Sequence, residues 1–145
     1  MSVIIEVVAP RLLGPALMVA AALIVKGYSD VGDGFSAGVI VALAISLRYI
    51  ALGHEHAERT LPILRRAPEA AACGLLVALA AGFFPVALGD PPFTHLPAPG
   101  ESVIEIGTLE LTTAVAFDVG LFVLVTSTLV VLVHQLARLV QDADA

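Results

Sequence analysis

Four long apolar stretches dominate the pattern of hydrophobic and polar positions along the 145-residue chain. They cover residues 10–26, 35–52, 69–88 and 111–136. About 20 apolar residues, rising about 1.5 Å each in a helix, cross the ~30 Å hydrocarbon core of a bilayer. The stretches are too long and continuous for the ~10-residue strands of a membrane barrel. We therefore predict an all-α integral membrane protein with four transmembrane helices, forming a single domain over residues 1–145.

Composition supports insertion into lipid. The chain is 59% hydrophobic and only 14% charged, whereas soluble domains have about 45–50% apolar and about 25% charged residues. The net charge of −6 argues against a nucleic-acid partner, because no basic patch is available to displace counterions from phosphates. The chain shows no nucleophile–base pair, so an autonomous enzyme is not expected, and we expect no cofactor.

The basic residues predict an orientation. If the N-terminus is cytoplasmic, only Lys26 lies outside, and six arginines lie at the inner side: Arg11, Arg48, Arg59, Arg65, Arg66 and Arg138. Cytoplasmic loops of membrane proteins carry such an excess of Lys and Arg. We therefore predict a multi-pass protein of the plasma membrane, the inner membrane in a bacterium with two, with both termini cytoplasmic. The glycine-rich turn after the first helix and the acidic, proline-rich loop at 89–110 then face outward.

Small residues recur every four positions on two of the predicted helices. The second helix carries Gly34, Gly38, Ala42 and Ser46, and the third carries Ala70, Gly74, Ala78 and Gly82. Residues four apart share a helix face, and small residues let another backbone approach closely. The two stripes could pack against each other within the chain, or against helices of other subunits.

Polar residues inside the stretches are the candidates for function. Asp118 lies within the fourth stretch, where an ionised carboxylate costs about 2.5–3.5 kcal/mol to insert. It could form part of an ion or proton route, or it could be a hydrogen-bonded structural group. Arg48 and His134 lie toward the cytoplasmic ends and are expected to extend into the interface. His54 and His56 lack a clear third ligand, so no metal site is predicted.

Two blocks of the sequence resemble the MnhB/MrpB subunit family of multisubunit Na⁺/H⁺ antiporters. Residues 27–38 are similar to its G-H-N-x-P-G-G-G-F-x-G-G signature. The positions retained are Gly27, Gly32, Gly34, Phe35 and Gly38. The second block comprises residues 93–97, 107–111 and 116–120, with the sequences FTHLP, GTLEL and AFDVG. Val31 and Asp33 depart from the signature, where the family has Pro and Gly.

The resemblance implies a non-catalytic membrane subunit of a monovalent cation/proton antiporter. Its partners would be other antiporter subunits, including larger antiporter-like ones that carry most of the ion movement, with Na⁺ and H⁺ as the ions exchanged. Asp118 matches the family's membrane aspartate, and Glu110 matches a further family position, so both are candidates for an ion or proton route. The alternative is a structural membrane subunit of a hydrogenase-type or complex-I-related redox complex.

Overall fold

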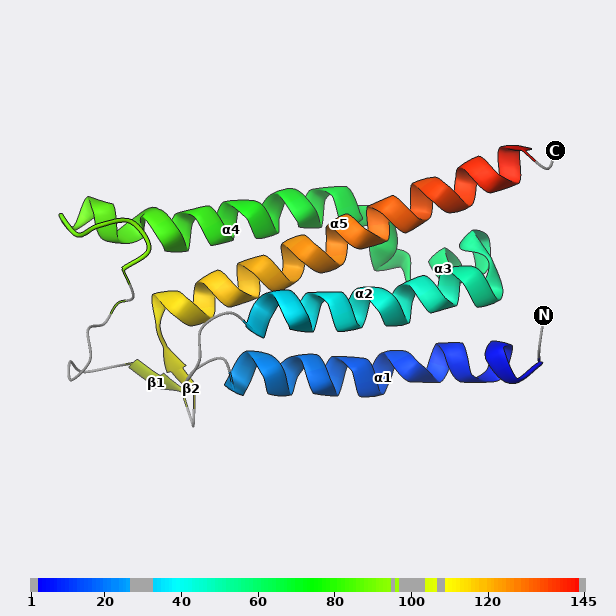
Figure 1. Ribbon diagram of the computed structural model, residues 1–145, viewed down its shortest axis with the longest axis horizontal. Coiled ribbons are helices and arrows are strands. Elements are labelled where there is room, and N and C mark those ends of the chain that lie inside the picture. The colour runs from blue at the N-terminus through cyan, green and yellow to red at the C-terminus, as the bar shows by residue number, and fades with distance from the viewer. Residues whose placement is uncertain (1–2, 27–32, 95, 97–103, 107–108, 144–145) are drawn as a thin grey trace.

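A computed structural model of the chain describes residues 3–26, 33–94, 96, 104–106 and 109–143. Helices make up most of it (Figure 1). Their bounds are α1 Val3–Lys26, α2 Asp33–Leu52, α3 His54–Thr60, η1 Pro62–Arg66, α4 Ala67–Ala87 and α5 Thr113–Ala143. Four of these helical segments are long and apolar enough to cross a bilayer. The predicted all-α membrane fold with four transmembrane helices is confirmed.

The four long helices lie side by side in the order α1, α2, α5 and α4 (Figure 1). Helix α5 packs against both α2 and α4, and α1 packs mainly against α2. A buried apolar cluster joins them through small and β-branched residues such as Ala20, Ala37, Val41 and Val130. Because α5 lies between α2 and α4, it contacts the motif-bearing helix on one side and the glycine-rich third span on the other.

Several element boundaries differ from the prediction. Helix α1 begins at Val3, with Pro10 and Pro15 inside it, because the apolar pattern extends further toward the N-terminus than the prolines suggested. The connection after α2 forms the short helices α3 and η1, which return the chain to α4. The last helix begins at Thr113 and continues to Ala143, well past the last apolar run.

A short β-hairpin in the connection between α4 and α5 was not predicted. Strand β1, Ile104–Ile106, pairs antiparallel with β2, Leu109–Leu111, and Glu105 lies opposite Glu110 in the register. The prolines in this loop led us to expect irregular structure. The alternating apolar and acidic residues of 104–106 and 109–111 instead fit a strand, whose side chains alternate between two faces.

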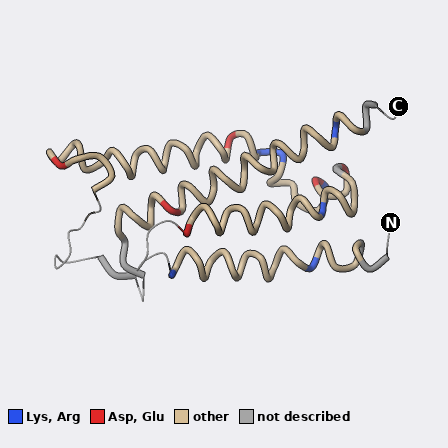
Figure 2. The backbone as a smooth tube through the Cα atoms, viewed as in Figure 1, with Lys and Arg blue, Asp and Glu red and all other residues tan. Residues whose placement is uncertain are grey.

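The charged residues separate toward the two ends of the bundle (Figure 2). Lys and Arg gather mainly at the end where both chain termini lie, and the middle of the helix row is almost free of charge. Lys26 is the exception, since it ends α1 at the opposite end, where α2 begins with Asp33. A low-charge band between two polar ends is the distribution that a bilayer requires.

Candidate functional site at the contact between α2 and α5

Asp118 is buried near the beginning of α5. It is only 1% exposed and is among the largest fully buried side chains of the described chain. It lies five residues after Thr113, the first residue of α5, which places it about 7–8 Å along the helix axis. A buried carboxylate requires polar partners or a proton, and Asp118 does make polar or electrostatic interactions here.

The first turn of α2 rests directly on the backbone at Asp118. A Cβ added to Gly34 would overlap the carbonyl oxygen of Asp118 and would come within 2.8 Å of its Cα. Only glycine leaves room for this approach. Asp33, which precedes Gly34, is half-buried, and its Oδ2 has no hydrogen-bond partner among the described residues. The departure from the family signature at Asp33 thus adds a second carboxylate immediately beside the contact.

The contact continues one turn further along both helices. A Cβ on Gly38 would lie 3.1 Å from the carbonyl oxygen of Phe122 and 3.0 Å from the Cβ of Val125. The Thr126 hydroxyl donates a hydrogen bond of 3.2 Å to the carbonyl oxygen of Gly38. A close glycine contact and an interhelical hydrogen bond therefore fix α2 against α5 just inside Asp118.

Helix α4 approaches the other side of α5 in the same way. A Cβ on Gly74 would lie 2.5 Å from the amide nitrogen of Leu124, and one on Gly120 would lie 2.6 Å from that of Ala78. The two small-residue stripes therefore do pack within the chain, but against α5 rather than against each other. Gly120 was missed as a packing residue because it is a single glycine outside any stripe.

The loop after α4 folds back over this end of the bundle through Phe93. Its amide donates a 2.7 Å hydrogen bond to the carbonyl of Gly82, and a Cβ on Gly82 would lie 2.5 Å from the ring of Phe93. The same ring packs against Phe83 and Phe117, with centroid separations of 5.6 and 5.9 Å. Since Phe117 immediately precedes Asp118, this loop is anchored beside the buried carboxylate.

The remaining predicted site residues are placed as follows. Phe35 is 55% exposed and does not point into the α2–α5 contact, whereas Ala42 is buried. Glu110 lies in β2, three residues before Thr113, where α5 begins. Gly27 and Gly32 lie outside the described residues. Among the described residues, no three His, Cys, Asp or Glu side chains form a metal-binding group.

At the opposite end, two residues expected to extend into the interface instead contact α3; Arg48 is buried and His134 is half-buried. Arg48 is only 8% exposed, and its Nη2 donates a 3.2 Å hydrogen bond to the Thr60 hydroxyl. The Nδ1 of His134 lies 2.7 Å from Oε1 of Glu58. Sequence reasoning missed both contacts because it did not predict α3, which carries Glu58 and Thr60 and packs against α2 and α5.

Comparison with known proteins identifies the family. A domain related to the MnhB subunit of Na⁺/H⁺ antiporter matches residues 4–131. The chain is 32% identical over 103 residues to the B-type subunit of a Na⁺/H⁺ antiporter from Alkalihalophilus pseudofirmus, covering 71% of this chain and 69% of that protein. It is also 34% identical over 125 residues to the probable A/B-type subunit of a K⁺/H⁺ antiporter from Rhizobium meliloti, covering 83% of this chain but 12% of that much longer protein.

The structure brings together the segments that carry the family resemblance. The segments that carry the resemblance are far apart in sequence, yet Gly34, Phe93 and Phe117 all converge around Asp118. With its four apolar helices, the protein is a multi-pass protein of the plasma membrane. The chain belongs to the MnhB family of cation/proton antiporter subunits.

Proposed function

We propose that this chain is a non-catalytic membrane subunit of a multisubunit monovalent cation/proton antiporter, in which Asp118 lines part of an ion or proton route. The observation that carries the proposal is the complete burial of Asp118 where the motif-bearing segments meet. An ionisable residue within a membrane helix is expensive to insert, and such residues commonly mark ion pathways and proton relays.

The polar environment of the α2–α5 contact suits such a role. Asp118 is adjacent to the glycine-bounded start of α2, where Asp33 contributes a second, half-buried carboxylate. Carboxylate and carbonyl oxygens are the ligands that hard cations prefer, and a carboxylate can also carry a proton. Glu110, in the hairpin that leads into α5, is proposed to line the approach from the same end of the bundle.

The complex would supply the remaining parts of the route. Helix α1 and the outer face of α4 expose many large apolar side chains, including Leu17, Met18, Leu76 and Phe84. In the membrane these faces must meet lipid or other helices. The proposed partners are the other antiporter subunits, including larger antiporter-like membrane subunits, while this chain contributes one wall of the route and braces its neighbours.

The proposal also concerns which monovalent cation the complex exchanges for protons. The names of the two relatives refer to Na⁺/H⁺ and K⁺/H⁺ exchange respectively. Both names describe antiport rather than redox chemistry, and we propose Na⁺ as the exchanged cation because the first relative's name specifies it.

Membership in the antiporter complex is tested by deleting this chain from the otherwise complete set of subunits. Everted membrane vesicles are energised to form a ΔpH, and NaCl or KCl is then added while a pH-sensitive dye reports proton movement. We expect cation-dependent collapse of ΔpH to disappear on deletion and to return when the intact chain is supplied. Full exchange in the deleted complex would refute the proposal. The role of Asp118 is tested by measuring exchange in an assembled complex that carries Asp118→Asn.

A bracing role has its own support, because glycine contacts with backbone atoms occur on both sides of α5. If the chain only braces the complex, Asp118→Asn would leave exchange unchanged, while a bulkier residue at Gly38 or Gly74 would abolish assembly. A transport role and a bracing role can therefore be distinguished by measuring transport activity per amount of assembled complex.

A further inference from the structure

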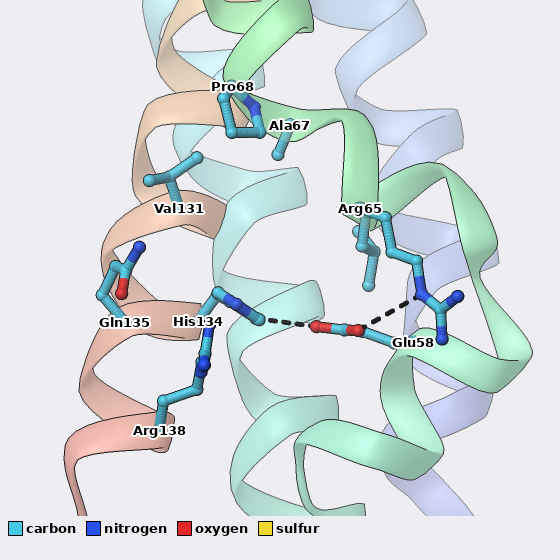
Figure 3. Close-up of a pocket in the computed structure, with 9 residues that line it drawn as sticks. Glu58, Arg65, Ala67, Pro68, Val131, His134, Gln135 and Arg138 are labelled. Carbon is cyan, nitrogen blue, oxygen red and sulfur yellow. Dashed lines mark ion pairs between the residues drawn. The ribbon is translucent and has the colours of Figure 1, made fainter.

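A polar pocket opens at the end of the bundle opposite to Asp118. Its volume is about 310 Å³, and it lies between the junction of η1 with α4 and the C-terminal half of α5 (Figure 3). Its polar lining comes from Glu58, Arg65, His134, Gln135 and Arg138. Ligand pockets typically measure about 300–1,000 Å³, so this pocket has room for a small polar group rather than for a large molecule.

The pocket favours an anion although it contains Glu58. One oxygen of Glu58 lies 2.7 Å from Nδ1 of His134, and the other lies 3.4 Å from Nε of Arg65. The carboxylate therefore already has partners within the protein, as Figure 3 shows. Arg65 and Arg138 bring two positive charges against the one negative charge of Glu58. Arginine guanidinium groups bind phosphate by several hydrogen bonds at once.

The pocket is also bordered by apolar surface. Leu132, Leu136 and Leu139 follow the lining residues Val131, Gln135 and Arg138 by one position each on α5, and they are 53%, 62% and 65% exposed. One position is a rotation of about 100° on a helix, so these leucines form the adjoining face. In η1, Ile63 precedes the lining residue Leu64 and is 73% exposed. The polar pocket and these apolar surfaces adjoin where the span that includes η1 and α4 begins.

We propose that this pocket binds the phosphate-bearing headgroup of an anionic phospholipid, whose acyl chains lie along the exposed leucine face of α5. Arg65 and Arg138 contact the phosphate, and Gln135 donates a further hydrogen bond from the rim. Free inorganic phosphate shares the headgroup's charge but cannot use the leucine face. Basic pockets at the membrane boundary between helices are suited to such headgroups. This lipid site is independent of the proposed role of Asp118, since it lies at the other end of the bundle.

The test places a photoreactive benzoylphenylalanine at Leu136, which is exposed beside the pocket and does not line it, in the intact antiporter complex. The complex is reconstituted into phosphatidylcholine vesicles that contain a minor fraction of phosphatidylglycerol, irradiated, and examined by mass spectrometry of this chain. We expect the phosphatidylglycerol adduct to exceed that lipid's share of the vesicle. Arg65→Gln and Arg138→Gln should each lower its yield by about fivefold. Arg66→Gln is the matched control, because Arg66 is exposed and does not line the pocket.

Each outcome bears on the proposal. Adduct yields that stay equal in Arg65→Gln, Arg138→Gln and wild type would overturn it, as would adducts that merely follow the lipid composition. Binding of inorganic phosphate that Arg65→Gln weakens, without any enrichment of the phosphatidylglycerol adduct, would assign the pocket to free phosphate and overturn the lipid site. If one of the two glutamine variants fails to assemble, the other carries the test alone, because both arginines line the pocket.

Discussion

Phe93 shows how one side chain can position a loop beside a buried carboxylate. Its ring occupies the space that the missing side chain of Gly82 leaves on α4, and it also contacts Phe117 on α5. Its backbone has a φ of 62°, a left-handed conformation that is unfavourable for a bulky residue. The aromatic contacts and the hydrogen bond to Gly82 compensate for this conformation, so the ring is required to keep the loop in place.

Replacing Phe93 with Ala should therefore loosen the loop. The ring is 52% exposed, so the loss should be about 0.8–1.5 kcal/mol, half the value for a fully buried aromatic side chain. We expect an earlier thermal aggregation of the purified complex. Phe84→Ala is a control of equal exposure, and equal losses from Phe84→Ala and Phe93→Ala would show that the contacts of Phe93 have no special role.

At the scale of elements, α5 is organised by glycines on both of its sides. Gly34 of α2 and Gly74 of α4 face backbone atoms of α5, which cannot move aside as the end of a flexible side chain could. The structure therefore depends on the absence of a single carbon atom at these positions. Van der Waals packing of this kind is the main force between helices in lipid, where the hydrophobic effect is lacking.

Gly34→Ala and Gly74→Ala should each destabilise the helix row by about 1–3 kcal/mol through overpacking. Gly14→Ala provides the control, because a Cβ at Gly14 meets no atom of the described chain within 4 Å. The measurement is the amount of intact complex recovered on a native gel. Normal assembly of both variants would mean that the separation between α5 and its neighbours is wider than the structure indicates.

The sequence predicted the helices themselves better than it predicted which helices pack against one another. Long apolar runs identified the four spans, and spacing identified the small-residue stripes, because both signals are local. The partner of each stripe could not be predicted, since a flat helix face accepts any close-fitting helix. Asp118 was recognised from its unusual location, whereas the pairing of Glu58 with His134 depends on α3, a short helix without an apolar pattern.

At the scale of the whole molecule, the two ends of the bundle differ in chemistry. Asp33 and Asp118 lie near the end where α2 and α5 begin, while the arginine-rich end carries both chain termini (Figure 2). The positive-inside rule predicts that the arginine-rich end faces the cytoplasm. The carboxylates of the proposed route then lie toward the outside, and the proposed lipid pocket lies at the cytoplasmic surface.

This orientation is tested by fusing reporters to the C-terminus. A fluorescent protein that folds only in the cytoplasm should become fluorescent, and alkaline phosphatase, which is active only outside it, should remain inactive. The reverse pattern would invert the topology and would place the Asp118 end of the bundle at the cytoplasm. Fusions at residues 89–90, after the third span, should give the opposite signals and serve as the internal control.

The charge of Asp118 is proposed to serve ion or proton transfer, and Asp118→Asn removes that charge alone. The amide has nearly the same size as the carboxylate but cannot ionise, so the Gly34 contact, which involves only the backbone of Asp118, should be retained. Asp33→Asn is the comparison from the same end of the bundle, because its half-buried carboxylate is proposed to assist Asp118.

The measurement is Na⁺-dependent collapse of ΔpH in everted vesicles, normalised to assembled complex. We expect at least a tenfold loss of exchange for Asp118→Asn, about 1.4 kcal/mol or more, with assembly unchanged and with a smaller effect for Asp33→Asn. Wild-type exchange by a normally assembled Asp118→Asn complex would contradict a role for this carboxylate in transport.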